Sequence, residues 1–191
     1  MITPAGAPSL SLAEATLAVI DMQVAFRDKH SDWGIPRYAE VAARIALLAE
    51  RFRERVLWTK FIRDPLEAGV WSDYYDRWSA FRVDSDSALW DLTLTPEPGQ
   101  PIISSSNFSK WGPDLASHVP LGAPLLLCGV ATDCCVLATA LGAVDAGRSV
   151  VLVTDACAAI DDDAQQQTLR LLSLLAPMVT LTTTAAVLEG G

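Results

Sequence analysis

Two adjacent cysteines, Cys134 and Cys135, have the clearest capacity for chemistry in this sequence. They stand in residues 129–136 (GVATDCCV), directly after an apolar run that predicts a buried strand. A thiol in the first turn of the helix that follows would lie among free backbone N–H groups at the positive end of the helix dipole. That position lowers the pKa of a thiol and favours the nucleophilic thiolate, and the same N–H groups can hold an oxyanion. Position therefore favours Cys135 as a nucleophile.

Other roles for the cysteines predict different neighbours. Free cysteine is among the most buried residue types, and packing is the interpretation for Cys128 and Cys157. The cysteines form no pair of spaced CxxC units and the chain has two histidines, so no metal site is expected. A redox pair of Cys134 and Cys135 would need a strained vicinal bridge, and it stays open as an alternative.

A nucleophilic thiol needs a proton acceptor, and Asp21 is the strongest candidate. It closes the apolar run at residues 16–20, where a carboxylate can serve as a general base. A cap for the loop that follows is the competing interpretation of Asp21. His30 and His118 stand in polar surroundings, where exposed side chains are expected.

The elements that must position these residues alternate between apolar runs and helical patterns. Strands are predicted at residues 16–21, 56–59, 102–104, 125–128, 149–154 and 178–182, and helices at 38–52, at 133–146 and from 161. This alternation predicts an α/β fold: a three-layer α/β/α domain over residues 1–191 with a mainly parallel, Rossmann-like sheet of about six strands. Ligands bind beyond the carboxyl ends of such strands, where Asp21, Lys60 and residues 128–135 fall.

Composition narrows the partners of this chain. Its 191 residues are 51% hydrophobic and 19% charged, and the net charge of −9 disfavours nucleic acid and anionic membrane surfaces. A small-molecule substrate is the expected partner. Residues 1–19 lack the basic flank of a secretory signal and the cysteines lack a disulfide framework, so a cytoplasmic protein with reduced thiols is expected.

Two segments resemble a known family. Residues 19–23 (VIDMQ) with Phe26, and residues 129–136, are similar to the two signature segments of the isochorismatase-like cysteine hydrolases, which include nicotinamidases and N-carbamoylsarcosine amidases. The resemblance implies a cysteine-dependent amidohydrolase that cleaves a small amide or ureido substrate through a thioester. It assigns the nucleophile to Cys135 and the base to Asp21, and it requires no organic cofactor.

The resemblance also implies an oxyanion site and a catalytic lysine. A cis peptide bond between Val130 and Ala131 would aim the Ala131 N–H, with that of Cys135, at the oxyanion. The family lysine normally stands near the position of Ser105, where this chain departs from the pattern. Lys110, several residues later, is the predicted third catalytic residue, and Lys60 is the alternative.

A second departure concerns metal. Nicotinamidase-like members carry a metal-binding Asp-x-His element after the second strand, whereas residues 58–65 here read WTKFIRDP. The resemblance therefore implies no metal and disfavours nicotinamide as a substrate. True isochorismatases lack the nucleophilic cysteine, so Cys135 also disfavours vinyl-ether hydrolysis.

Aromatic residues supply the predicted substrate wall. Residues 70–78 (VWSDYYDRW) are the most aromatic stretch, which fits either a pocket wall or subunit packing. The side chains predicted to contact substrate are Phe26, Trp33, Trp71, Tyr74, Trp78, Trp111 and Thr132. Three arginines are candidates to bind a substrate carboxylate: Arg63, Arg77 and Arg82.

Several alternatives remain open from sequence. Within enzymes, an esterase could use the same thiol on another acyl group. Outside them, the chain could be a non-catalytic ligand-binding relative, or a thiol redox protein that uses Cys134 and Cys135. By analogy with acidic α/β hydrolases, a homo-oligomer, either a dimer or a tetramer, is expected.

Overall fold

Six apolar segments pair into one sheet in the computed structural model, which describes residues 12–28 and 30–190. The strands run in the order β3-β2-β1-β4-β5-β6, and all neighbours are parallel. Their bounds are Thr16–Ile20 (β1), Val56–Phe61 (β2), Ile102–Ser105 (β3), Leu125–Val130 (β4), Val150–Ala158 (β5) and Val179–Thr182 (β6). Each predicted strand is present, and β5 continues four residues beyond its predicted end.

Burial explains why the central strands are continuous apolar runs. Every residue of β1 and β4 is buried, as expected for parallel strands that are covered on both faces. The chain leaves β1 toward β2 and β3 on one side, and β4 to β6 fill the other side. The direction of winding therefore changes between β1 and β4, which is where ligands bind in open α/β sheets.

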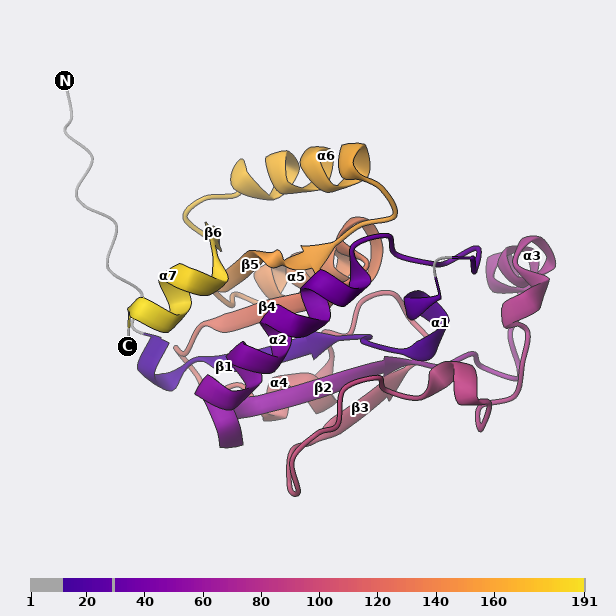
Figure 1. The fold of residues 1–191 in the computed structure, drawn as a ribbon, viewed down its shortest axis with the longest axis horizontal. Coiled ribbons are helices and arrows are strands. Elements are labelled where there is room, and N and C mark those ends of the chain that lie inside the picture. Colours follow the sequence, from indigo (N-terminus) through magenta and orange to yellow (C-terminus); the bar gives the residue numbers. More distant parts are fainter. Residues whose placement is uncertain (1–11, 29, 191) are drawn as a thin grey trace.

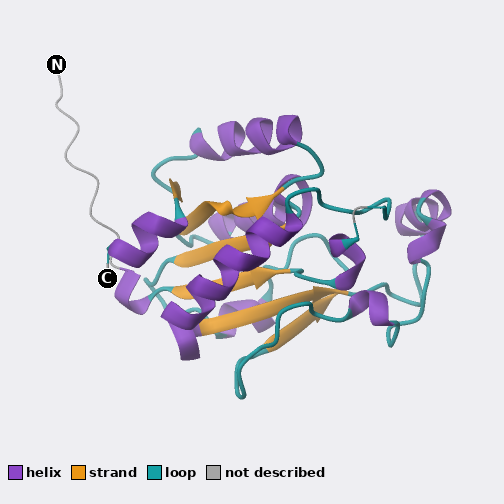
Figure 2. Cartoon of the chain, in the orientation of Figure 1, coloured by secondary structure: helices purple, strands orange, loops and turns teal. Residues whose placement is uncertain are grey.

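Helices cover both faces of the sheet, as the three-layer class requires. Helices α2 (Tyr38–Phe52) and α7 (Thr184–Glu189) pass in front of the strands in Figure 1, whereas α4 (Pro113–Ser117) and α5 (Leu137–Asp145) lie behind them. Figure 2 shows the same layering by element type. Helix α2 begins and ends where the sequence predicts, because its buried residues repeat at helical spacing.

The last long helix, α6 (Asp162–Ser173), packs beside β6. The Asp161 side chain caps it by accepting a hydrogen bond of 2.7 Å from the Ala164 N–H. The predicted acidic start of this helix is confirmed.

Short elements gather at the carboxyl ends of the strands. Helices α1 (Val24–Arg27) and α3 (Val70–Arg77) lie beyond the arrowheads of β1 and β2 in Figure 1. The remaining short turns of 3-10 helix are Leu12–Glu14, Arg53–Arg55, Ser79–Phe81 and Ala88–Trp90. This end of the sheet therefore carries the irregular backbone from which a site can be built.

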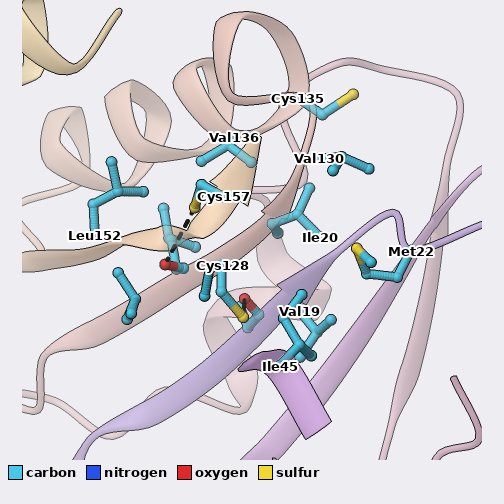
Figure 3. Packing of buried hydrophobic residues seen from close by; sticks show 14 of the residues in the cluster. Val19, Ile20, Met22, Ile45, Cys128, Val130, Cys135, Val136, Leu152 and Cys157 are labelled. Carbon is cyan, nitrogen blue, oxygen red and sulfur yellow. Dashed lines mark hydrogen bonds between the residues drawn. The ribbon is translucent and has the colours of Figure 1, made fainter. Parts of the chain in front are cut away.

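Cys128 and Cys157 belong to the core, as predicted. Both are buried, and their thiols lie near backbone carbonyl oxygens, Cys128 at 3.7 Å from that of Ala18 and Cys157 at 3.9 Å from that of Leu127 (Figure 3). Burial raises the pKa of both thiols, so they stay protonated and act as small apolar side chains.

No helix in the described part of the chain is both long enough and apolar enough to cross a bilayer. Residues 1–11 of the segment weighed above for a secretory signal lie outside the described residues.

Candidate active site

The close approach of β1 and β4 brings the two signature segments together. Ile20, the last residue of β1, pairs with Gly129 of β4, whose φ of +117° favours glycine. A Cβ at Gly129 would overlap the Ile20 carbonyl oxygen and lie 2.7 Å from the Ile20 backbone nitrogen. Glycine is therefore required here, and its absence of a side chain places Asp21 beside the chain that leaves β4.

Asp21 is completely buried and is held by the neighbouring strand. Its backbone has a positive φ of 49°, and its N–H donates to the Thr59 hydroxyl at 3.2 Å. The same hydroxyl donates to Asp21 Oδ1 at 2.6 Å. The other carboxylate oxygen, Oδ2, receives no hydrogen bond from the residues that the structure describes. Asp21 thus keeps one fixed acceptor atom for a proton.

Lys110 supplies the positive charge next to that atom. Its Nζ lies 3.1 Å from Asp21 Oδ2, and both side chains are fully buried. This contact is an ion pair without hydrogen-bond geometry, and one N–H of the ammonium donates to the Asn107 carbonyl oxygen at 2.7 Å. The ammonium also lies 4.7 Å from the centre of the Phe61 ring. A buried charge pair of this kind needs such additional partners to offset its desolvation.

The alternative lysine, Lys60, faces away from Asp21. It stands in β2 between Thr59, which hydrogen-bonds Asp21, and Phe61, which packs against Lys110. Successive side chains of a strand point to opposite faces, so Lys60 points to the other face of the sheet. The structure therefore brings Lys110, and not Lys60, to the carboxylate.

Contacts with helix α5 hold the loop that places Lys110 at the site. The Lys110 N–H donates to the Thr139 hydroxyl at 2.9 Å, and that hydroxyl donates to the Cys135 carbonyl oxygen at 2.7 Å. One turn further along, a Cβ at Gly142 would lie 2.9 Å from the Ser109 hydroxyl oxygen. Thr139 and Gly142 were missed from sequence, because nothing in a helical pattern shows which loop packs on the helix.

Cys134 and Cys135 lie in a turn that sequence predicts only as the start of a helix. Residues Thr132–Val136 wind as a π-helical turn before α5 begins, a geometry found frequently at functional sites. Cys135 is 3% exposed and Cys134 is partly exposed. In Figure 3, Cys135 lies beyond β4, next to Val130 and away from the two core cysteines.

The two thiols and the ion pair influence one another. The pKa of Cys135 is raised well above the usual thiol range by its hydrogen bond with Cys134, by burial and by the charge of Asp21, against the opposing charge of Lys110. The pKa of Cys134 is lowered, chiefly by the hydrogen bond from Cys135. Cys135 therefore holds its proton at rest and needs a base to release it, contrary to the expectation from helix position alone.

The chain between β4 and the π turn has the backbone form that the resemblance implies. The peptide bond between Val130 and Ala131 is cis. The Ala131 carbonyl oxygen accepts hydrogen bonds of 3.1 Å from the N–H groups of both Cys134 and Val136. Ala131 and Cys135 both line one cavity.

That cavity has a volume of about 290 Å³ and an aromatic wall. A wider groove beside the end of α2, with a volume of about 1020 Å³, holds none of the predicted site residues. The aromatic residues of the cavity wall are Phe26, Trp33, Phe61, Tyr74, Trp78 and Phe108. Phe26, Trp33, Tyr74 and Trp78 were predicted wall residues. Phe61, the last residue of β2, and Phe108, which follows β3, were missed because the direction of a side chain at the end of a strand is not visible in sequence.

Three residues predicted to contact substrate do not line the cavity. Trp71 packs behind the wall, with its ring centre 4.9 Å from that of Phe108. Trp111 lies against α5 instead, because the close approach at Gly142 holds it there. The Thr132 hydroxyl is buried and has no hydrogen-bond partner among the described residues.

Metal ligands do not converge in the described residues 12–28 and 30–190. No group of three or more His, Cys, Asp or Glu side chains there has a geometry that could hold a metal ion.

The parallel sheet, the cis peptide and the buried thiol beside a lysine–aspartate pair define an α/β/α protein with its site at the switch between β1 and β4. The sequence profile described as Isochorismatase domain matches residues 15–186. The chain belongs to this family.

Solved structures share the fold at low sequence identity. A cysteine hydrolase from Pseudomonas syringae pv. phaseolicola 1448A is 21% identical with a TM-score of 0.83, and the match covers 99% of this chain and 97% of that one. An isochorismatase-like hydrolase from Alkaliphilus metalliredigens is 19% identical with a TM-score of 0.74, over 93% and 99% of the two chains. A pyrazinamidase from Pyrococcus horikoshii, in complex with zinc, is 22% identical with a TM-score of 0.73, over 89% and 99%.

Proposed function

We propose that this protein is a cysteine-dependent amidohydrolase that cleaves a small amide or ureido substrate through a thioester on Cys135. The observation that carries the proposal is the buried Lys110–Asp21 pair with Oδ2 open to a proton, beside a buried thiol. The pyrazinamidase among its structural neighbours, named for a C–N hydrolysis, agrees with this reaction class.

The first half of the reaction forms the thioester. The Cys135 thiol gives its proton to Asp21 Oδ2 as the sulfur attacks the substrate carbonyl carbon. The N–H groups of Ala131 and Cys135 hold the oxyanion. In other enzymes, removal of one such donor lowers kcat by about 10²–10³-fold. The C–N bond then breaks, and Asp21 returns the proton to the leaving nitrogen, which departs as ammonia or an amine.

The second half releases the acid. Asp21, again unprotonated, takes a proton from water as the water oxygen attacks the thioester carbonyl. The C–S bond breaks, and the proton on Asp21 passes to the Cys135 sulfur. The Lys110 ammonium, 3.1 Å from Asp21 Oδ2, holds this carboxylate in place between the two proton transfers.

A screen of small amides and ureido compounds for ammonia release tests the proposal. Cys135→Ala is expected to abolish release, and Asp21→Asn to lower kcat by about 10²-fold or more, since each removes a group that moves in the reaction. Cys134→Ser is the matched control at the neighbouring thiol and should retain activity. Release that survives Cys135→Ala, or no release from any compound, would contradict the proposal.

One observation favours a second candidate function. Cys134 and Cys135 are adjacent free thiols that line the same cavity, as a dithiol redox pair would. If these thiols form a disulfide, mild oxidation would lower the intact mass by that of two hydrogens, and a reductant would reverse the change. A homo-oligomeric state and a cytoplasmic location stay predictions.

A further inference from the structure

The charge around the cavity is one-sided. Among the described residues that line it, the charged side chains are those of Asp32 and Asp133, with no lysine, arginine or histidine. Lys110 lies behind Phe61, where its charge is paired with Asp21. A negatively charged substrate would therefore enter without a cationic partner, and in a chain of net charge −9.

The arginines that sequence offers for a substrate carboxylate are engaged elsewhere. Arg63 and Arg82 both pair with Glu67, and Arg82 also contacts Asp76 at 2.7 Å. Arg77 lies over the Trp78 ring at 4.7 Å. None of the three lines the cavity, so the expectation of a bidentate carboxylate contact is wrong for this cavity.

Asp133 offers an acceptor that the protein itself does not use. Its Oδ1 is buried, and no described residue donates a hydrogen bond to it. The negative charge of Asp133 on the cavity wall attracts a cationic group on a ligand, whether or not that group carries an N–H. Asp133 directly precedes the two thiols in the sequence, and it lines the same cavity as Cys135.

The aromatic wall adds a second attraction for the same charge. The rings of Phe26, Tyr74, Trp78 and Phe108 line the cavity, while Trp33 is stacked on Phe81 at 3.7 Å. Aromatic faces attract ammonium groups by about 0.5–2 kcal/mol each, most strongly when water is excluded. The volume of about 290 Å³ limits the ligand to a small molecule.

We propose that this cavity selects small amides that carry an ammonium or quaternary ammonium group, held between the aromatic wall and Asp133. The proposal rests on the proposed amidohydrolase function and specifies its substrate class. In this arrangement the substrate carbonyl lies at Cys135 and its cationic group points toward Asp133, while Asp32 lies at the exposed rim of the cavity.

Binding to the Cys135→Ala protein tests this preference without turnover. The probes are trimethylammonioacetamide and its neutral isostere 3,3-dimethylbutanamide, which differ by a nitrogen in place of a carbon. Calorimetry should give a dissociation constant about tenfold or more lower for the cation. In Asp133→Asn, the dissociation constant of the neutral amide divided by that of the cation should fall toward one. Asp114→Asn removes the same charge at an exposed residue of α4 and should preserve this ratio.

The outcomes separate this proposal from the function on which it rests. Equal or weaker binding of the cation, no binding of the cation at millimolar concentration, or an unchanged ratio in Asp133→Asn would overturn the charge preference. Ammonia release by the wild-type protein is scored independently. Release from the neutral amide with no preference for the cation would leave the amidohydrolase standing and remove only the substrate class.

Discussion

At the scale of single residues, the buried pair of Lys110 and Asp21 is the feature on which the chemistry depends. Lys110→Met should lower kcat/KM by about 10²-fold or more, because the general base would lose the positive charge that lies 3.1 Å from its Oδ2. It should also lower the free energy of unfolding by about 3–5 kcal/mol, since a buried charge is left unpaired. Ammonia-release kinetics and urea unfolding measure the two effects.

Lys60→Met is the matched control. Lys60 stands on β2, beside the strand that Asp21 follows, but its side chain faces the other side of the sheet. It should leave kcat/KM within a fewfold of the wild type. If Lys60→Met impaired catalysis as strongly as Lys110→Met, the assignment of the catalytic lysine would be lost.

Sequence predicts some of these residues better than others. Asp21 follows β1 directly, and Cys135 stands in the turn that joins β4 to α5, so the fold class brings both to one edge of the sheet. Lys110 stands five residues beyond the end of β3, and its position depends on the path of a loop. That path is set by contacts with Thr139 and Gly142, which no local pattern reveals.

At the scale of elements, Thr139 links the lysine loop to the turn that carries the nucleophile. Thr139→Val keeps the shape but leaves the buried Lys110 N–H without an acceptor, at a cost of about 1–3 kcal/mol. We expect kcat to fall about tenfold, because the loop that carries Lys110 shifts relative to Cys135.

Thr139→Ser keeps the hydroxyl and should restore most of kcat. A fall that serine does not rescue would indicate that the methyl group, and hence packing, is what Thr139 contributes.

Gly129 sets the spacing between β1 and β4 at the site. Gly129→Ala should cost at least about 3 kcal/mol, since it combines a positive φ with overlap of the Ile20 backbone. Gly122→Ala is the control: its φ is +82°, but a Cβ there meets no atom within 4 Å, so only about 1–2 kcal/mol is expected. Urea unfolding compares them, and equal losses would mean that the strand contact has no effect.

Length decides which elements sequence can predict. The strands and the fifteen-residue helix α2 show clear apolar periodicity. Helices α1, α4 and α7 are of four to six residues, too short to show a repeat, and the π turn departs from the helical period that sequence reasoning assumes.

At the scale of the whole molecule, burial of ionisable groups couples stability to alkaline pH. Burial raises the pKa of Tyr38 from 10.0 to about 12, against the opposing hydrogen bond to Thr93 and the charge of Arg27. Above pH 10 the unfolded chain loses this proton while the folded chain keeps it. The stabilisation is complete below pH 10 and is lost between pH 10 and 12, by about 2–3 kcal/mol.

Tyr38→Phe should therefore lose less stability than the wild type between pH 9 and pH 12, as measured by urea unfolding across that range. The buried thiols remain in both proteins, so the difference isolates the phenol. Parallel pH curves for the two proteins would show that Tyr38 does not titrate with unfolding.

Fold class and the location of the site follow from sequence, because both depend on apolar patterning and on strand ends. The one-sided charge of the cavity does not, because it depends on which arginines are paired elsewhere. Glu67 engages both Arg63 and Arg82, and no sequence pattern distinguishes these arginines from free ones.

The most direct test of the central claim is the intact mass of the protein after reaction with the nitrile analogue of the amide that is hydrolysed fastest. A thiolate adds to a nitrile carbon and a nearby acid protonates the nitrogen, which leaves a stable thioimidate. The account predicts a gain of one whole nitrile, mapped to Cys135, retained in Cys134→Ser and lost in Asp21→Asn. An adduct on Cys134, no adduct at all, or one that forms equally fast in Asp21→Asn would contradict it.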